Sequence, residues 1–507
     1  MEQSRKPFLL GAVLLVVLGF LAFGKILTYD FAAWDTFPLI AAGRVGDGGG
    51  LGKVLLTPLM GSYFPHGQYY RPMVHLSFAL DHALWGMKPF GYHLTGLLLY
   101  VLNAVLLLGL TRRLLPGSRA SAAVAAAAVL LLHPSVAAVV PVIPRRIDLL
   151  AAAFMIGSLL CLLRPVRGPG TLSLGLVLGL CAMGSKESAL CLPVLHAAWV
   201  WLGSSDRDPG KRLRAALGAS WPLWVLAAGF FAVRWGVLGG LGGVASDASA
   251  PSWLLRVPIM LAGFLGNLFV PLPNREGMAW AVLLVPAALL VLAYSVRRFR
   301  IWKDDPERRR VVLFGLLWLG LLLGLQLPLG ATPLRLAYLA LVPFSLLMAV
   351  ALDDFLDAIT SRGGGKARGR GGLLWGAIPA VLWLSFLALS PLVHSYAHPW
   401  RDAGRTTRRV LDLIDPHLAS GSSGGVVSLS DLPSTVLYDP ERFRIAVPFT
   451  TILADYSLRA WSDLRYPANN TVITVGSRVS LRAPVDPDGV TLVADGEGLR
   501  FEFGEQP

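Results

Sequence analysis

The chain has 507 residues, of which 54% are hydrophobic and only 15% are charged, whereas a soluble domain averages about a quarter charged residues. So few charges cannot coat a soluble protein of this size, which excludes an ordinary soluble enzyme. The hydrophobic residues also form runs long enough to cross the roughly 30 Å of hydrocarbon in a bilayer. The sequence therefore predicts an all-α, polytopic integral membrane protein.

The net charge of +14 is unevenly distributed along the chain. From Leu392 onward the net charge is −3, so the preceding residues carry +17. This excess lies in short loops between the apolar runs, as the positive-inside rule predicts for a membrane protein. The charge therefore reports topology, and we expect no nucleic-acid partner.

Eleven apolar runs are predicted to be transmembrane helices. In chain order they cover residues 8–27, 93–111, 120–142, 147–163, 171–184, 188–203, 216–236, 278–296, 311–330, 337–356 and 373–391. The first run is longer than the core of a signal peptide, so we interpret it as a retained helix. Placing the basic loops in the cytoplasm puts the N-terminus inside and the C-terminus outside.

Three other parts complete the predicted organisation. Residues 28–92 form a long extracytoplasmic loop within a transmembrane domain of residues 1–391. Residues 254–272 break the alternation of charge and are expected to be an interfacial or re-entrant segment on the outer side. Residues 392–507 lack apolar runs and predict a small extracytoplasmic α/β domain, with a helix over 401–418 and strands over 425–429 and 471–475.

Seven charged residues fall on the predicted outer side, close to the membrane. They are Asp35, Arg71, Arg146, Asp148, Lys186, Glu187 and Arg335. Arginine and lysine are normally depleted there, so their presence on that side calls for an explanation. A cavity that binds an anionic lipid headgroup and positions a carboxylate would explain it. The alternatives are solvated loop charges and ion pairs that fix tight turns, such as a pair between an arginine and the aspartate of the turn at 145–148.

Asp35 is the candidate general base, because a carboxylate beside the membrane surface can deprotonate an acceptor hydroxyl. Asp30 competes for this role from five residues earlier in the chain. Arg71 follows two tyrosines that would also suit an interfacial aromatic belt. Its guanidinium is of the kind that pairs with a lipid phosphate.

Seven short motifs follow one another in order along the chain. They are WDTFPLI (34–40), YRPM (70–73), PFGYH (89–93), HP (133–134), RIDLL (146–150), SKE (185–187) and RLAY (335–338). Together they resemble the GT-C membrane glycosyltransferases. The closest branch is that of the transmembrane, tetratricopeptide-bearing O-mannosyltransferases and their bacterial relatives. The resemblance covers about the first 350 residues, and the tetratricopeptide array is missing here.

This resemblance implies a hexosyltransferase that uses a polyprenyl-phosphate-linked sugar on the outer face of the cell (inner) membrane, with inversion at the anomeric carbon. By match, Asp35 is the base. The phosphate-binding candidates are Arg71, Arg146, Lys186 and Arg335. The supporting residues are Asp30, Tyr70, His93, Asp148, Glu187 and Tyr338.

Cofactor and acceptor are less defined. The family pattern usually has two adjacent acids, whereas here Asp35 is followed by Thr36, so no carboxylate pair supports a divalent cation and no metal ligand is predicted. The acceptor is expected to be a protein, lipid or polysaccharide outside the cytoplasm. The alternative function is a transporter or flippase for a lipid-linked or anionic solute. It would use the same outer charges, but neither an inverted repeat nor matching inner-side charges are evident.

Overall fold

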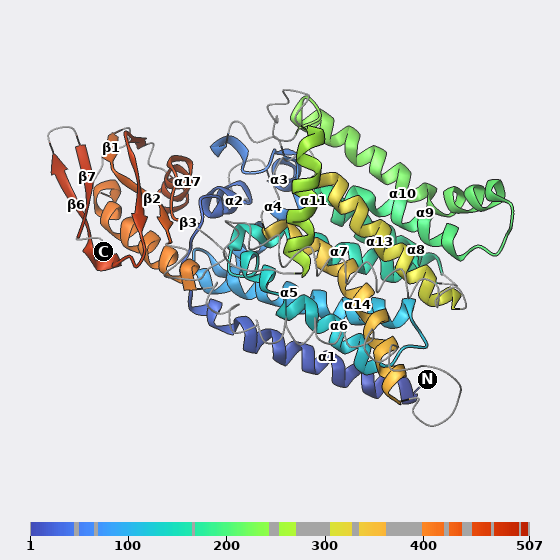
Figure 1. The fold of residues 1–507 in the computed structure, drawn as a ribbon. Coiled ribbons are helices and arrows are strands. Elements are labelled where there is room, and N and C mark those ends of the chain that lie inside the picture. The colour runs from blue at the N-terminus through green and yellow to red at the C-terminus, as the bar shows by residue number, and fades with distance from the viewer. Residues whose placement is uncertain are drawn as a thin grey trace.

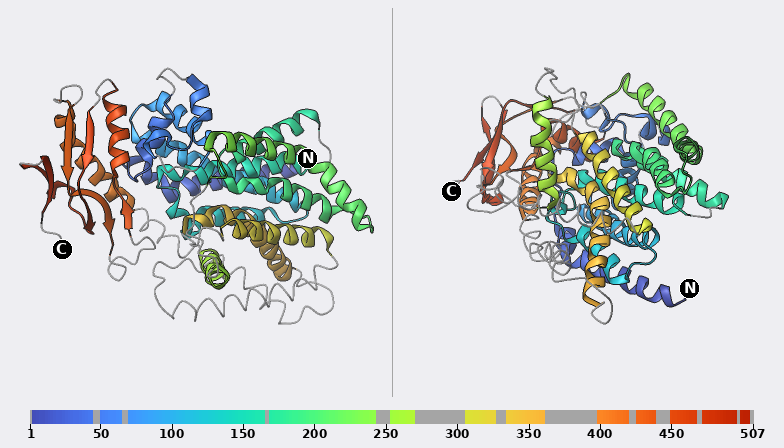
Figure 2. Two further views of the ribbon diagram at one scale, coloured as in Figure 1. Left: turned by 90° about the horizontal axis from the view of Figure 1, so that it is seen from above. Right: turned by 45° about the vertical axis from the view of Figure 1, so that its right-hand side comes forward.

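The computed structural model describes residues 2–44, 50–64, 69–164, 168–242, 253–269, 305–326, 334–360, 398–419, 425–438, 449–467, 471–495 and 498–504. They form a bundle of long helices with a smaller β-containing domain at one end (Figure 1). The domain lies at the end of the bundle opposite the N-terminus. Two further views show the same arrangement (Figure 2).

The bundle is built from long and medium helices. They are α1 (Glu2–Phe23), α5 (Pro89–Leu114), α6 (Ala120–Leu132), α7 (Arg146–Leu162), α8 (Pro169–Met183), α9 (Leu192–Gly203), α10 (Pro209–Leu238), α11 (Trp253–Phe269), α13 (Pro306–Gln326) and α14 (Ala337–Thr360). Short 3-10 helices adjoin them: η1 (Gly24–Thr28), η3 (Pro134–Ala138), η4 (Ile143–Arg145), η5 (Glu187–Cys191) and η9 (Leu334–Leu336).

Six helical stretches of the described residues are long and apolar enough to cross a membrane. They are Lys6–Thr28, Pro89–Leu114, Ala120–Ala138, Pro209–Leu238, Pro306–Gln326 and Leu334–Asp357. Helix α1 keeps large apolar side chains on the outside of the bundle, with Leu10 and Leu21 each 72% exposed. Such a surface suits lipid rather than water. The predicted class, a multi-pass membrane protein, is confirmed, while the count of eleven spans stays a prediction.

Local sequence signals explain where α10 begins and ends. Proline at its first position costs no hydrogen bond, and the Asp208 side chain accepts a hydrogen bond from the Gly210 amide at 2.8 Å. The helix ends at Gly239, which has a φ of 68° and so takes the left-handed conformation that glycine adopts without strain.

The predicted run 120–142 was wrong in its extent. Helix α6 stops at Leu132, because Pro134 has no amide hydrogen to donate and the preceding His133 is extended, and the chain continues as a short 3-10 helix. The His133 imidazole is also engaged there, with Nε2 3.0 Å from the Leu268 carbonyl oxygen of α11. The predicted spans 278–296 and 373–391 lie outside the described residues. The segment 254–272 is largely helical as α11, and its re-entrant character stays a prediction.

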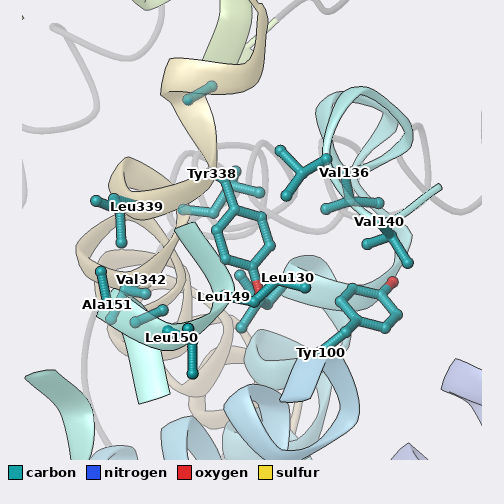
Figure 3. Close-up of a cluster of buried hydrophobic side chains, with 14 of the residues drawn as sticks. Tyr100, Leu130, Val136, Val140, Leu149, Leu150, Ala151, Tyr338, Leu339 and Val342 are labelled. Carbon is teal, nitrogen blue, oxygen red and sulfur yellow. The ribbon is translucent and has the colours of Figure 1, made fainter. Parts of the chain in front are cut away.

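The core of the bundle lies where α5, α6, α7 and α14 meet (Figure 3). Tyr100 and Tyr338 are fully buried among Leu130, Leu149 and other apolar side chains. The Asn103 side chain donates to the Tyr338 hydroxyl at 3.0 Å, which satisfies the tyrosine oxygen away from water. The packing holds the start of α14 firmly against the bundle.

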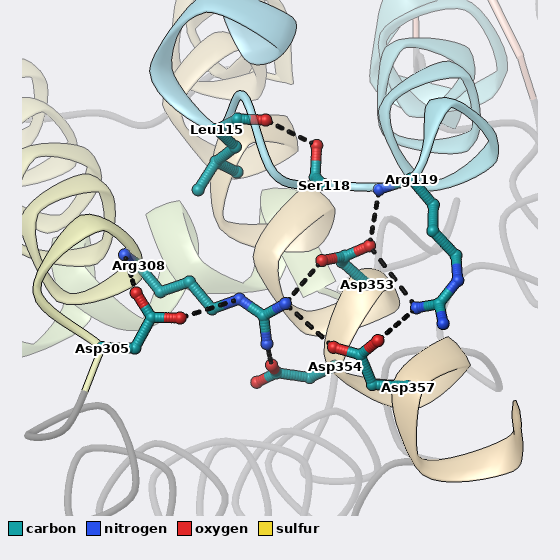
Figure 4. Close-up of polar contacts among 8 residues, drawn as sticks. All are labelled: Leu115, Ser118, Arg119, Asp305, Arg308, Asp353, Asp354 and Asp357. Atoms are coloured by element: carbon teal, nitrogen blue, oxygen red, sulfur yellow. Dashed lines mark hydrogen bonds and ion pairs between the residues drawn. The ribbon is translucent and has the colours of Figure 1, made fainter. Parts of the chain in front are cut away.

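An ion-pair cluster joins the N-terminal end of α13 and the C-terminal end of α14 to the loop before α6 (Figure 4). The Arg308 guanidinium contacts Asp353 at 2.7 Å, Asp357 at 2.9 Å, and also Asp354. The Arg119 backbone amide donates to Asp353 at 2.8 Å, and the Arg119 side chain pairs with Asp357. Two loops predicted to be cytoplasmic thus meet at one end of the bundle. That this end faces the cytoplasm stays a prediction.

The first long loop is folded rather than extended. It contains helices at the end of the bundle that carries the β-containing domain: α2 (Thr36–Ala42), α3 (Gly50–Leu56), η2 (Gly61–Tyr63) and α4 (Pro72–Trp85). Helix α2 packs against both α4 and the helix α17 (Asp455–Arg465) of the C-terminal domain. The loop therefore lies between the two parts of the molecule.

The C-terminal domain contains a helix over 398–419 and two small sheets. Its other elements are β1 (Val426–Ser430), β2 (Leu432–Leu437), β3 (Phe449–Thr451), α17 (Asp455–Arg465), β4 (Val472–Val475), β5 (Arg478–Arg482), η10 (Pro487–Gly489), β6 (Val490–Asp495) and β7 (Gly498–Phe503). One sheet has the order β4-β1-β7-β6 and the other β3-β2-β5. Strand β1 pairs in parallel with β4 and β7, and β2 pairs in parallel with β5.

Asp431, with a φ of 56°, lets the chain pass from one sheet to the other. The predicted helix and both predicted strands correspond to elements of this domain, whereas the predicted boundary at 392 lies outside the described residues.

Candidate active site

Asp35 lies at the tip of a tight turn between the first helix and α2. Ala33 has a φ of 77°, an unfavourable conformation for a residue with a Cβ, and its amide donates to the Thr451 carbonyl oxygen at 3.1 Å. The Asp35 carbonyl oxygen accepts from the Leu39 amide at 3.1 Å, which starts helix α2. Strained backbone of this kind persists where surrounding structure fixes it, and it is common at functional sites.

The Asp35 carboxylate is partly buried and hydrogen-bonded to the C-terminal domain. Its Oδ1 accepts from the Tyr456 hydroxyl at 2.9 Å. Burial raises the pKa of Asp35, and this outweighs the lowering by that hydrogen bond and by Arg335, Arg145 and Arg71. A carboxylate with a raised pKa is a stronger base toward a hydroxyl proton than an ordinary surface aspartate.

Two of these arginines, Arg145 and Arg335, have no carboxylate within ion-pair distance among the residues that the structure describes. The Arg145 guanidinium donates to the Ala138 carbonyl oxygen and lies 5.2 Å from the centre of the Trp400 ring. Burial, followed by repulsion from Arg335, lowers the pKa of Arg145 to about 9. Arg335 is exposed. Two neighbouring cations without a paired anion form a site that an anion such as phosphate would stabilise.

Arg71 is already neutralised by a carboxylate. Its Nη2 lies 2.7 Å from Glu187 Oε2 and its Nε lies 3.1 Å from the same oxygen. Arg234 Nη1 binds the other oxygen of Glu187 at 2.8 Å. Burial alone would raise the pKa of Glu187, but the Arg71 guanidinium, assisted by Arg234, lowers it to about 2. Arg71 therefore borders the site as part of a triad with net charge +1.

Lys186 and Asp148 form a second pair beside this triad. The Lys186 ammonium contacts Asp148 Oδ1, and both side chains are largely buried. Asp148 also contributes to the electrostatic field at Arg71 and Arg145. The pair links the start of α7 to the turn between α8 and α9, so the sequence-predicted residues from these two segments do come together.

Arg146 lies apart from this group. Both it and Asp81 are only 1% exposed, and their side chains approach to 2.6 Å. Arg146 also donates to the Tyr92 carbonyl oxygen at 2.8 Å and to Ser77 Oγ at 3.0 Å. Both of its terminal nitrogens are thus engaged inside the protein, an arrangement typical of a structural ion pair, whereas Arg145 has no carboxylate at ion-pair distance among the described residues.

The predicted supporting residues occupy the surrounding core. Asp30 pairs with Arg408 at 3.3 Å, and burial raises the pKa of Asp30. The buried Tyr70 ring stacks on Phe230, with ring centres 5.6 Å apart. His93 is buried with its ring edge-on to Tyr29, and Tyr338 lies in the core described above.

Three residues of this region were missed by the sequence analysis: Arg145, Arg234 and Tyr456. Arg234 lies in an apolar helix, and a charge there is itself a functional signal. Arg145 adjoins the motif that suggested Arg146. Tyr456 is 421 residues from Asp35 along the chain, and nothing in its local sequence marks it.

The surroundings of Asp35 suit an anion better than a divalent cation. Its charged neighbours are arginines, and the adjacent Thr36 hydroxyl is turned to the Ala32 carbonyl oxygen. Within the described ranges, no three histidine, cysteine, aspartate or glutamate side chains are grouped as metal ligands would be.

Comparison with known proteins supports the resemblance noted in the motifs. No family model matches the chain. Over 180 residues it is 31% identical to the protein O-mannosyl-transferase Tmtc1 of Drosophila melanogaster. The chain is similar to an O-mannosyltransferase. The matching stretch is 34% of this chain but only 20% of the fly protein. The predicted resemblance to this branch is thereby confirmed.

Similarity to solved structures is distant. The oligosaccharyltransferase AglB of Archaeoglobus fulgidus, solved with an inhibitory peptide and a dolichol-phosphate, has a TM-score of 0.47 at 11% identity, over 93% of this chain and 65% of that chain. ArnT of Cupriavidus metallidurans, bound to undecaprenyl phosphate, has a TM-score of 0.42 at 14% identity, over 92% of this chain and 89% of that chain. At these values the similarity assigns no function and no residue role.

Proposed function

We propose that this protein is a membrane glycosyltransferase of the GT-C type, which transfers a sugar from a polyprenyl-phosphate-linked donor to an acceptor hydroxyl on the outer face of the cell (inner) membrane. The observation that supports this best is a partly buried carboxylate, Asp35, within the electrostatic field of Arg335 and Arg145. The first group can remove a proton and the other two can hold a phosphate.

The proposed reaction is a single displacement. Asp35 accepts the proton of the acceptor hydroxyl while the acceptor oxygen attacks the anomeric carbon. The bond between that carbon and the phosphate oxygen breaks, and its electron pair leaves with the polyprenyl phosphate. Arg145 and Arg335 stabilise the negative charge that this phosphate gains, with Arg71 at the border of the site. Attack opposite the leaving group inverts the anomeric carbon.

Release of polyprenyl phosphate tests this function directly. Purified protein would be incubated in lipid vesicles with labelled polyprenyl-phosphate sugars and a set of hydroxyl-bearing acceptors. The name of the fly relative makes mannose and serine- or threonine-containing peptides the first to test. We expect labelled product and free polyprenyl phosphate in equal amounts. Movement of intact donor across the bilayer, without release, would instead establish the transporter or flippase alternative.

The two arginines give a more specific prediction. Removing a charged hydrogen bond to the donor phosphate costs about 1.5–3 kcal/mol, so Arg145→Ala and Arg335→Ala should each lower kcat/KM for the donor about 10- to 100-fold. The exposed Arg459 of α17 provides a control, because Arg459→Ala should change this value less than about twofold. Steady-state rates measured over a range of donor concentrations give kcat/KM for the two arginine variants and for the control. An unchanged donor dependence in Arg145→Ala would remove that residue from the phosphate site.

A further inference from the structure

The C-terminal domain contacts the residues immediately before the candidate base. The Trp34 indole donates to the Ser434 carbonyl oxygen of β2 at 2.9 Å, and the Ala33 amide bonds to Thr451 of β3. The Ser457 hydroxyl of α17 donates to the Trp34 carbonyl oxygen. Three separate elements of the domain therefore hold the turn whose strained conformation presents Asp35.

Helix α17 is anchored so that Tyr456 points at Asp35. Asp455 pairs with Arg478 of β5 at 2.7 Å, which fixes the first turn of the helix from one side. The Tyr456 ring meets Phe64 of the first loop edge-on, with ring centres 5.4 Å apart. Its hydroxyl is then 2.9 Å from Asp35 Oδ1.

In this contact the Tyr456 hydroxyl is the hydrogen-bond donor and the Asp35 carboxylate is the acceptor. Burial and the proximity of Asp35 raise the pKa of Tyr456, so its hydroxyl stays protonated and acts as the donor. A donor to one carboxylate oxygen stabilises the ionised form and leaves the second oxygen free to receive a proton. The contact thus fixes the orientation of the carboxylate and opposes the effect of its burial.

We propose that Tyr456 is a positioning residue for Asp35, and that the C-terminal domain therefore completes the active site rather than serving only as an appended module. This inference rests on the proposed function, in which Asp35 is the base. It assigns a role in the reaction to the part of the chain that no motif covers.

The test is the pH dependence of kcat/KM in Tyr456→Phe, which removes the hydroxyl and keeps the ring. Loss of the hydrogen bond should raise the pKa of Asp35, so the acidic limb of the profile should move to higher pH by about one unit. The other charged groups facing Asp35 are Arg335, Arg145 and Arg71, and all three stay in place.

Tyr63→Phe is the matched control, because the Tyr63 hydroxyl donates to Asp463 Oδ2 at 2.8 Å across the same interface without contacting Asp35. It should leave the acidic limb unshifted. An unshifted limb in Tyr456→Phe, or an equal shift in both variants, would overturn the positioning role. Size-exclusion profiles identical to the wild type show that both variants are folded.

A second measurement does not depend on turnover. The infrared band of the protonated Asp35 carboxyl, isolated as the difference between the wild type and Asp35→Asn, should titrate at higher pH in Tyr456→Phe. A shift in this band without any glycosyl transfer by the wild type would retain the contact and reject the proposed function. Transfer that depends on Asp35, with no shift in the band, would retain the function and reject the role of Tyr456.

Discussion

Asp35→Asn is expected to lower kcat for glycosyl transfer at least about 100-fold, because a positioned general base contributes about 10²- to 10⁴-fold. Asparagine has nearly the same shape and its side-chain oxygen can still accept from the Tyr456 hydroxyl, so folding and membrane insertion should be preserved. Unlike the carboxylate, however, the asparagine amide cannot take up the proton of the acceptor hydroxyl. Single-turnover transfer from labelled donor measures this step.

Asp30→Asn is the informative comparison for that experiment. Asp30 is also partly buried and has a raised pKa, but it pairs with Arg408 rather than facing the cationic site. We expect its loss to change the rate less than about threefold. A severe defect in Asp30→Asn combined with near-normal transfer by Asp35→Asn would move the base to Asp30.

The buried pair of Arg146 and Asp81 should produce the largest effect on stability. Arg146→Met leaves the Asp81 carboxylate, 1% exposed, without its cation, which costs about 3–5 kcal/mol of unfolding free energy. Because apolar side chains can replace a buried pair at little cost, the double variant Asp81→Leu/Arg146→Met should recover most of this loss. Denaturant titration in mixed micelles measures the unfolding free energies of the wild type, the single variant and the double variant.

The exposed pair of Arg465 and Asp415, at 3.3 Å, is the matching control. Arg465→Met should cost less than about 1 kcal/mol, because water screens such pairs. If Arg146→Met is no more destabilising than this control but weakens donor use, Arg146 contacts the donor phosphate, as the motif resemblance predicted.

Most of the helical framework could be predicted because lipid imposes a simple rule on it. An apolar run must span the bilayer as a helix, so the run 93–111 reappears within α5. The rule fails where a local signal overrides hydropathy. The run 120–142 stays apolar and buried beyond Leu132, but Pro134 cannot continue the helical hydrogen bonds.

The candidate site could be predicted only in part, because its pairings depend on helix packing. Charges on the predicted outer side identified Asp35, Arg71 and Arg335, but not that Glu187, 116 residues away, pairs with Arg71. Arg145 and Arg146 show the limit most clearly. Arg145 ends the 3-10 helix η4 and Arg146 begins α7, and only the second guanidinium pairs with Asp81.

The contact between Asp35 and Tyr456 has a consequence for biosynthesis. The chain is made from the N-terminus, so Asp35 reaches the membrane while more than 400 residues are still to be synthesised. Its hydrogen-bond donor, Tyr456, lies 421 residues later in the chain and is synthesised long after it. A nascent chain that has not yet reached Tyr456 therefore holds the carboxylate without the residue that orients it, and under the proposed function we expect no turnover of the lipid-linked donor at that stage.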